Sequence, residues 1–338
     1  MLHEIMSSAM LVIGLKVPLI VIHHITYRCN LSCKMCSLKF LPSVQELTTA
    51  ACIDLQQDFR KHGTLVWGYS GGEPLVREDL EQLYVSAKHL GMRTVLNTNG
   101  VLLPQRLELG RMADVLEIAL DGGRESHDAL RGDGAFDKAV AGLEAVTRLG
   151  PSRPRIIIQT ILSNRSIQPD QLDEVLRLAS TYDVKIGFTL AASHRVDDRL
   201  LDNARIHTPN AQQFRDFRRW LEHEKTGRNG NLIQDDPAFF RSLGHFPDYP
   251  NRIPCKAGLR RCVVDPTGLT LPCADQFDHP FKHLPRGKRF GYGYAGFKSL
   301  PRAYPCHQQY CYTAKTNFIL GNPWRIAEYF FTPSSGCK

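Results

Sequence analysis

Three cysteines, Cys29, Cys33 and Cys36, follow an apolar run with the spacing Cys-x3-Cys-x2-Cys. Three thiolates this close in sequence can hold one iron–sulfur cluster and leave a fourth iron without a protein ligand. A closed structural site uses four protein ligands instead. The spacing therefore predicts a metal centre with an open position for a substrate or cofactor. A zinc site, or three unrelated thiols, is the alternative that the spacing leaves open.

A glycine-rich turn forms the second motif, within LVWGYSGGEPLVREDLEQL at residues 65–83. We expect a short buried strand over 65–69, a turn over 70–74 and then a helix. Gly71 and Gly72 would let the backbone approach a ligand closely. Glu73 would offer its carboxylate to an ammonium group of that ligand. Taken alone, the motif is equally compatible with a plain strand-to-helix turn.

Together, the cysteine triad and the Gly-Gly-Glu-Pro turn resemble the radical S-adenosylmethionine (SAM) superfamily. The resemblance continues in LNTNG at 96–100 and in the run 118–140, and it spans roughly residues 20–190. It implies a [4Fe–4S] cluster on the triad, with SAM bound to the open iron. It also implies reductive cleavage of SAM to methionine and a 5′-deoxyadenosyl radical, which removes hydrogen from a substrate.

The resemblance also implies a set of SAM contacts. Met35 stands where relatives often place an aromatic side chain beside adenine, and its thioether is a polarisable apolar contact. Ala119 replaces a serine of the family pattern, so a contact from Arg131 to the SAM carboxylate is expected rather than a ribose contact from residue 119. Gln159 faces either the barrel mouth or the outer helices. The full expected set is Met35, Gly71, Gly72, Glu73, Pro74, Asn99, Asp121, Arg131 and Gln159.

The chain alternates apolar runs with amphipathic helices, which indicates an α/β fold. The runs lack clean alternation, as parallel strands buried on both faces do. Six such units predict an open (β/α)6 partial barrel, which the family resemblance also implies. Ligands bind at the carboxyl ends of such strands, so the motifs should gather on one rim. The expected strands cover 19–25, 65–69, 93–97, 115–120, 155–161 and 185–190.

A length of 338 residues is ample for a barrel and an appended unit. We expect an N-terminal extension at 1–18, the barrel core at 19–195, a bridging helical segment at 196–252 and a small C-terminal domain at 253–338. In the bridging segment a helix should begin near Thr208-Pro209. Its apolar stripe would consist of Phe214, Phe217, Trp220 and Leu221.

A second cysteine group lies in the C-terminal domain, around an expected β-hairpin at 262–273. Four thiolates can close a second [4Fe–4S] cluster completely. The arrangement resembles the auxiliary-cluster domain called twitch, which is related to the larger SPASM domain. Cys262 lies inside the hairpin and need not be a ligand, and Cys52 should be a buried core residue. Zinc or free thiols remain the alternative. The expected ligands are Cys255, Cys273, Cys306 and Cys311.

The charge pattern bears on partners. The net charge is +8, and one loop holds much of the basic charge, which indicates an anionic small-molecule substrate or simply a solvated face. No aromatic-interleaved pattern of an RNA-binding protein accompanies this loop, so no nucleic acid is expected. The basic residues of the loop are Lys282, His283, Arg286, Lys288 and Arg289.

An oxygen-sensitive cluster and free thiols together predict a cytoplasmic protein, served by an external one-electron reductant such as flavodoxin or ferredoxin. The apolar N-terminus is broken by Lys16 and Pro18 and is too short for a membrane span.

The sequence favours a radical enzyme acting on a sugar, cyclitol or nucleotide-linked natural-product intermediate, by oxidation, epimerisation or carbon–carbon bond formation. A peptide-modifying maturase is the nearest alternative. About twenty residues before the first strand leave little room for the peptide-recognition domain that such enzymes usually carry. An iron–sulfur electron carrier is the alternative of a different class, and the Gly71–Pro74 turn and the pair Asp121 and Arg131 argue against it.

Overall fold

The computed structural model describes residues 16–36, 38–190, 208–243, 258–272 and 293–300. These residues form one sheet in the strand order β6-β5-β4-β3-β2-β1-β7-β8. Neighbouring strands pair in parallel except β7 with β8, which are antiparallel. The strands are β1 (Ile20–Thr26), β2 (Val66–Gly71), β3 (Arg93–Thr98), β4 (Val115–Ala119), β5 (Arg155–Leu162), β6 (Lys185–Leu190), β7 (Arg261–Val264) and β8 (Thr270–Leu271).

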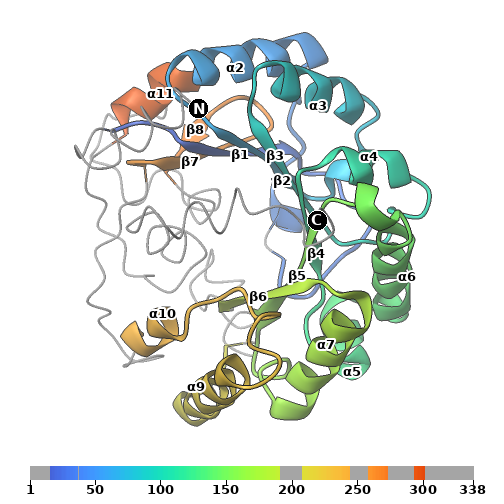
Figure 1. The fold of residues 1–338 in the computed structure, drawn as a ribbon. Coiled ribbons are helices and arrows are strands. Elements are labelled where there is room, and N and C mark those ends of the chain that lie inside the picture. Colours follow the sequence, from blue (N-terminus) through green and yellow to red (C-terminus); the bar gives the residue numbers. More distant parts are fainter. Residues whose placement is uncertain (1–15, 37, 191–207, 244–257, 273–292, 301–338) are drawn as a thin grey trace.

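The helices lie on the outer side of the curved sheet (Figure 1). The sheet stays open, because β6 and β8 are edge strands that do not pair with each other. The six expected apolar runs form β1 to β6 in order, which confirms the partial-barrel prediction. The helices are α2 (Thr49–Lys61), α3 (Leu80–His89), α4 (Leu107–Met112), α5 (Arg124–Arg131), α6 (Ala135–Thr147), α7 (Pro169–Tyr182), α9 (Ala211–Thr226), α10 (Pro237–Ser242) and α11 (Gly293–Ser299), with short 3-10 turns η1 (Leu38–Phe40), η2 (Pro74–Val76) and η3 (Gly150–Ser152).

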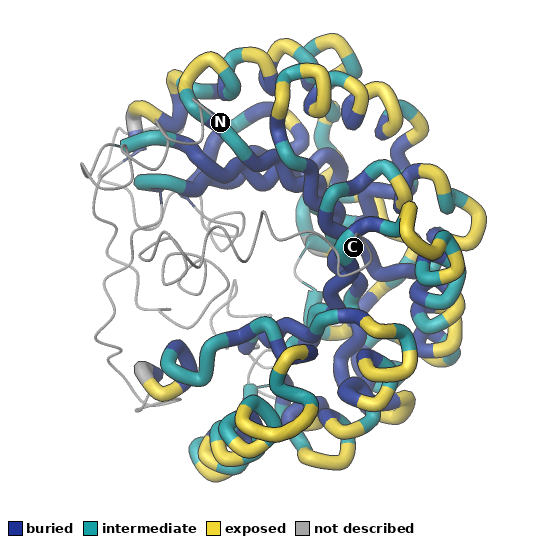
Figure 2. Tube along the Cα trace, viewed as in Figure 1, coloured by how far each residue is buried: buried dark blue, intermediate teal, exposed yellow. Residues whose placement is uncertain are grey.

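Both faces of the sheet are apolar. Alternate strand residues face the helices, where they join the large outer cluster that includes Trp67, Leu96 and Ile158. The residues between them form a separate inner cluster. This double burial explains why the runs lack a two-residue alternation, and Figure 2 shows the strands as the most buried part of the fold. The inner cluster is Leu19, Ile20, Ile22, Val66, Val95, Val115, Ile157 and Val263.

The expected hairpin is present, and it extends the main sheet. Strand β7 pairs in parallel with β1, and β8 returns beside β7. Helix α11 then packs against α2, where Tyr294 stacks on His62 at 3.5 Å between ring centroids. Cys262 on β7 is fully buried, as is Cys52 on α2. Both cysteines are therefore core residues, as expected for Cys52.

Helix α9 begins later than the sequence predicted. Its N-cap is Asn210 rather than Thr208, because Asn210 and Gln213 form a reciprocal capping box. The Asn210 side chain accepts the Gln213 N–H at 2.9 Å, and the Gln213 side chain accepts the Asn210 N–H at 2.9 Å. The predicted apolar stripe is confirmed, since Phe214, Phe217 and Leu221 are buried and Trp220 packs beside them.

Several predictions fall outside the described residues. These include the four expected auxiliary-cluster ligands Cys255, Cys273, Cys306 and Cys311, and the basic loop from Lys282 to Arg289. In the part of the chain that the structure describes, none of the helices has the length and apolar character needed to cross a bilayer.

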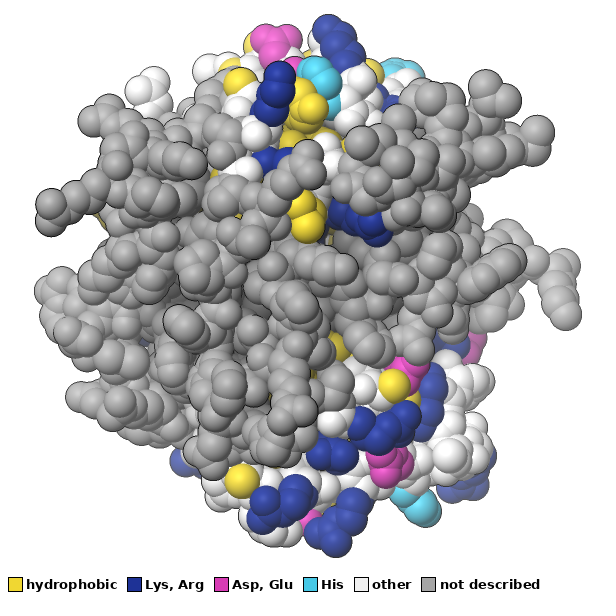
Figure 3. All heavy atoms as spheres, turned by 90° about the vertical axis from the view of Figure 1, so that its left-hand side faces the viewer, with side chains coloured by type: hydrophobic (Ala, Val, Ile, Leu, Met, Phe, Trp, Pro, Cys, Tyr) yellow, Lys and Arg dark blue, Asp and Glu magenta, His cyan; other side chains and the backbone are white. Residues whose placement is uncertain are grey.

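Two of the basic side chains on α9 and α10 form surface ion pairs. Arg219 pairs with Asp216, and Arg241 pairs with Glu222 at 3.1 Å. Figure 3 shows Lys and Arg side chains interspersed with acidic ones on the lower part of this face. Exposed pairs of this kind are screened by solvent and contribute little to stability.

Candidate functional site

The cysteine loop starts at an irregularity in β1. His24 pairs with Ser70 and Thr26 pairs with Gly71, so Ile25 is an extra residue in the register. Such a bulge re-aims the chain that follows it. The buried Arg77 guanidinium donates to the Ile25 carbonyl at 2.9 Å and so provides this carbonyl with a hydrogen bond. The last residues before Cys29 therefore leave the sheet from a fixed point.

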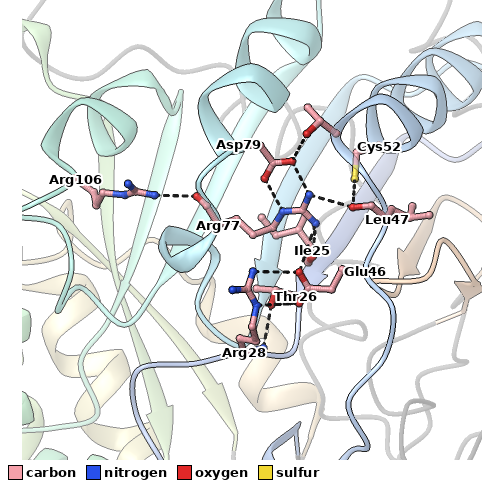
Figure 4. A network of polar contacts seen from close by, with 10 residues as sticks. Ile25, Thr26, Arg28, Glu46, Leu47, Cys52, Arg77, Asp79 and Arg106 are labelled. Carbon is pink, nitrogen blue, oxygen red and sulfur yellow. Dashed lines mark hydrogen bonds and ion pairs between the residues drawn. The ribbon is translucent and has the colours of Figure 1, made fainter.

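Glu46 holds the next residues of the same segment (Figure 4). The Thr26 hydroxyl donates to Glu46. Arg28 donates to Glu46 Oε1 and Oε2 at 3.3 and 3.2 Å. Arg77 lies 3.9 Å from Glu46 and forms its own ion pair with Asp79 at 2.6 Å. This network ties the residues that precede Cys29 to the loop before α2 and to the start of α3.

The two glycines of the Gly-Gly-Glu-Pro turn pack against the same segment. A Cβ at Gly71 would lie 2.2 Å from the Thr26 carbonyl oxygen, and one at Gly72 would lie 2.2 Å from the Arg28 carbonyl oxygen. The Gly72 N–H donates to Thr26 at 2.8 Å, and the Glu73 N–H donates to Arg28 at 2.9 Å. The two glycines therefore let the turn pack closely against the segment before Cys29, and they leave room for a ligand to approach the turn as well.

Glu73 is fully buried and joins three segments of the rim. Its Oε1 accepts the Leu75 N–H at 3.1 Å and the Thr98 hydroxyl at 2.8 Å, and its Oε2 accepts the Asn99 N–H at 2.8 Å. Burial raises the pKa of Glu73 to about 7, although these hydrogen bonds act in the opposite direction. A cationic group placed beside this carboxyl would favour its charged form.

Asn99 connects the end of β3 to the cysteine loop. Its Nδ2 donates to Asn30 Oδ1 at 2.7 Å and lies 3.9 Å from Cys29 Sγ. The Leu31 N–H points at the same sulfur from 3.4 Å. N–H donors directed at cysteine sulfur are a feature of iron–sulfur sites, where they tune the cluster.

Asp121 and Arg131 form a buried ion pair at the end of β4. Arg131 Nε lies 2.7 Å from Asp121 Oδ2, and Asp121 Oδ1 accepts the Ile161 N–H at 2.8 Å. Burial lowers the pKa of the Arg131 guanidinium, but the negative charge and the hydrogen bond of Asp121 act in the opposite direction. Cys33 and Cys36 also act in that direction, so the pKa of Arg131 is raised overall. The positive charge of Arg131 therefore acts on the thiols of the triad.

The comparisons with known proteins agree with this geometry. The family model described as the radical SAM superfamily matches residues 24–179. A mycofactocin maturase, MftC, of Mycobacterium ulcerans is 31% identical over 271 residues, covering 77% of this chain and 69% of the relative. The chain belongs to the radical SAM superfamily. The MftC protein of Mycolicibacterium smegmatis is 33% identical over 270 residues, and the chain spans 65% of that relative's length.

The fold is shared with a solved structure of low sequence identity. The structure of Streptococcus suis SuiB bound to the precursor peptide SuiA superposes with a TM-score of 0.65 at 15% identity. The match covers 98% of this chain and 78% of SuiB.

The [4Fe–4S] cluster and SAM are the cofactors of this superfamily, and the residues on the rim fit them. The cluster would take Cys29, Cys33 and Cys36, three thiols with Arg131 as a nearby counter-charge. Burial raises the pKa of Cys33 to about 11, so a bound cluster would displace its proton. In the described ranges no three His, Cys, Asp or Glu side chains are grouped as one metal ion would need, whereas each thiolate of a [4Fe–4S] cluster holds a different iron.

The remaining expected contacts lie near the rim or just below it. Pro74 is buried at the first position of η2, and Met35 is half-buried in the cysteine loop. Gln159 lies on the inner face of β5 and donates to Thr189 at 2.7 Å. Sequence reasoning missed Glu46 and Arg77, because long-range polar contacts leave no periodic signal along the chain.

Replacing Arg131 by alanine should lower the affinity for SAM about tenfold or more. The reason is the loss of a charge-assisted hydrogen bond to the SAM carboxylate, which contributes about 1.5–3 kcal/mol. Equilibrium binding of SAM to the reconstituted protein measures this change. The matched control is Arg124→Ala at the other end of α5, where the arginine is exposed and paired with Asp137. Equal SAM affinity in the two variants would remove Arg131 from the site.

Proposed function

We propose that this chain is a radical SAM enzyme that modifies a peptide. The observation that carries the proposal is the 31–33% identity to proteins named as mycofactocin maturases over 77% of the chain. The shared fold with SuiB, a protein solved with a precursor peptide, agrees with it. None of the relatives reported above is named for a sugar, cyclitol or nucleotide substrate, so they favour the peptide-modifying alternative.

Different residues of the chain would have separate roles around the bound cofactors. When bound, the cluster and SAM supply reductive cleavage of a carbon–sulfur bond and, from it, removal of hydrogen from the substrate. Glu73 would receive the ammonium group of SAM and Arg131 its carboxylate. Glu46 and Arg77 would fix the start of the cysteine loop, so that the target C–H bond is presented at a constant position.

The C-terminal cysteines extend the proposal. Cys255, Cys273, Cys306 and Cys311 would hold an auxiliary [4Fe–4S] cluster, which can accept an electron from the modified substrate or brace its binding site. A flavodoxin or ferredoxin would supply the electron for each cleavage of SAM.

The test is anaerobic reconstitution with SAM and dithionite, followed by assay of 5′-deoxyadenosine. A random 12-residue peptide library displayed on mRNA is selected on the SAM-loaded protein, and the enriched peptides are synthesised. We expect such a peptide to accelerate 5′-deoxyadenosine release and to change in mass, whereas a pool of sugar nucleotides and cyclitols does not. Faster 5′-deoxyadenosine release with that pool alone would favour a sugar, cyclitol or nucleotide substrate instead. A reducible cluster without any SAM cleavage would indicate an electron carrier.

A further inference from the structure

In the part of the chain that the structure describes, two glutamines on the β6 side of the barrel carry buried polar atoms without a hydrogen-bond partner. They are Oε1 of Gln159 and both Oε1 and Nε2 of Gln234. A buried polar group left unsatisfied destabilises the folded state, so such groups in a folded protein require an explanation. A ligand that supplies the missing hydrogen bonds is one such explanation when the groups lie beside a candidate active site.

The position of Gln159 follows from the strand pattern. Ile157 belongs to the inner cluster, and side chains two residues apart on a strand share a face. Gln159 therefore faces the inside of the barrel. In the sheet register it lies between Ala119 on β4 and Gly187 on β6, two residues with little or no side chain. Neither neighbouring strand therefore places a large side chain beside Gln159 at this level of the sheet.

Gln234 lies on the far side of β6 at the same level. Ile233 forms a parallel bridge with Ile186, and the Gln234 N–H donates to the Ile186 carbonyl at 2.8 Å. Ile233 and Ile186 share the outer apolar cluster. Alternation along the extended segment then places Gln234 on the inner face, level with Gly187. The two glutamines flank Gly187 from opposite sides.

The hydrogen-bonding capacity of the pair matches a peptide backbone. The Gln159 Nε2 is used by Thr189, which leaves its oxygen as an acceptor, while Gln234 offers both an acceptor and donors. Each peptide group carries one donor and one acceptor. Two strand spacings separate the glutamines, about 9.5 Å, which is roughly the length of three residues of an extended peptide.

The location also favours the substrate over SAM. Apart from Gln159 itself, the residues expected to bind the cluster and SAM lie at the ends of β1 to β4 and on α5. Gln234 is beyond β6, the edge strand that stands five strands from β1 in the sheet order. Among the described residues, Gln234 and Gln159 therefore lie on the β6 side of the sheet, away from the strands that carry the cysteine loop.

We propose that Gln159 and Gln234 form a subsite for the backbone of an extended peptide substrate. Their side-chain amides would hydrogen-bond to peptide groups about three residues apart. The inference rests on the proposed peptide-modifying function. The uncharged amides give the site affinity for peptide groups without selecting particular side chains, so that side-chain selection lies elsewhere in the protein.

The test uses the reconstituted, SAM-loaded full chain and a peptide enriched from the random 12-residue library. Gln159→Met and Gln234→Met remove the amides and keep similar volume. Each should weaken peptide binding about tenfold, the effect of one lost hydrogen bond with its partner left buried. The SAM affinity of Gln234→Met should stay within about twofold, because Gln234 is not among the expected SAM contacts. The control is Gln56→Met, because Gln56 is also buried with an unpartnered oxygen but lies on α2 outside the sheet.

A scan of single backbone N-methyl groups along the peptide completes the test. On the wild-type protein, two sensitive positions about three residues apart are expected, and one of them should lose its sensitivity in each variant. Unchanged peptide affinity in both variants, loss of SAM affinity instead, or a scan without paired sensitive positions would overturn the subsite while leaving the peptide function intact. The N-methyl scan on the wild-type protein tests the subsite even if a variant fails to fold. Failure of every peptide to bind would overturn the proposed function itself.

Discussion

Replacing Cys29, Cys33 and Cys36 together by alanine should abolish reductive cleavage of SAM. The variant should also lose one cluster, about four iron and four sulfide per chain. The physical reason is that the three thiols are the only protein ligands expected for this cluster, so no residual site remains. Iron and sulfide analysis beside an assay of 5′-deoxyadenosine release measures both effects.

Cys52→Ala is the matched control for the triad. Cys52 is a fully buried cysteine of α2 that packs in the outer apolar cluster. Its replacement leaves a small cavity and should lower the melting temperature slightly, with iron content and SAM cleavage unchanged. SAM cleavage that persists in the triple variant would contradict the assignment of the triad.

The architecture was predictable because each strand carries its own signal. Strands such as β1 and β5 carry apolar side chains on both faces, and this pattern distinguishes strands of a covered parallel sheet from those of a half-exposed one. Once the strands are known to be parallel, the rim follows, because all the carboxyl ends meet at one edge. The nearness of Asn99 to Cys29 is a direct consequence.

The supports of the cysteine loop were not predictable in the same way. Arg77 reads as one more charged residue at the start of a helix, yet it is buried and donates to Ile25, Leu47 and Asp79. Its role depends on the register shift in β1, which no local pattern encodes. Glu46 lies in a loop before α2, and only the folded chain brings it to Thr26 and Arg28.

The substrate class was also beyond the sequence pattern. The motifs that were recognised bind the cofactors, and these are common to enzymes with unrelated substrates. The residues that would discriminate a peptide from a sugar are single polar side chains such as Gln159 and Gln234. Their register relative to Gly187 becomes visible only in the sheet.

Replacing Gly72 by alanine should lower SAM cleavage by about a hundredfold or more. The new Cβ would lie 2.2 Å from the Arg28 carbonyl oxygen, so the turn and the segment before Cys29 must separate. A displacement of about 1 Å in positioning groups can cost this much activity. Iron content, SAM affinity and the rate of 5′-deoxyadenosine release, measured on the same preparation, show whether the cluster or the SAM contact is affected first.

Gly134→Ala separates this effect from backbone strain. Gly134 has a left-handed φ of 72°, and a Cβ there meets nothing within 4 Å. Alanine at this position should cost about 1 kcal/mol of stability and leave the cluster and SAM cleavage intact. A Gly72→Ala variant that matches Gly134→Ala in activity would show that the turn does not position the cysteine loop.

A Cβ at position 72 would clash with backbone atoms, which makes the Gly72→Ala prediction more specific. The obstructing atoms belong to the backbone of Tyr27 and Arg28, so no shorter side chain at either position can relieve the clash. Combining Gly72→Ala with Arg28→Ala should therefore restore nothing, and it also removes the hydrogen bonds from Arg28 to Glu46. Recovery of activity in the double variant would mean that the Arg28 side chain, rather than the backbone geometry before Cys29, limits the reaction.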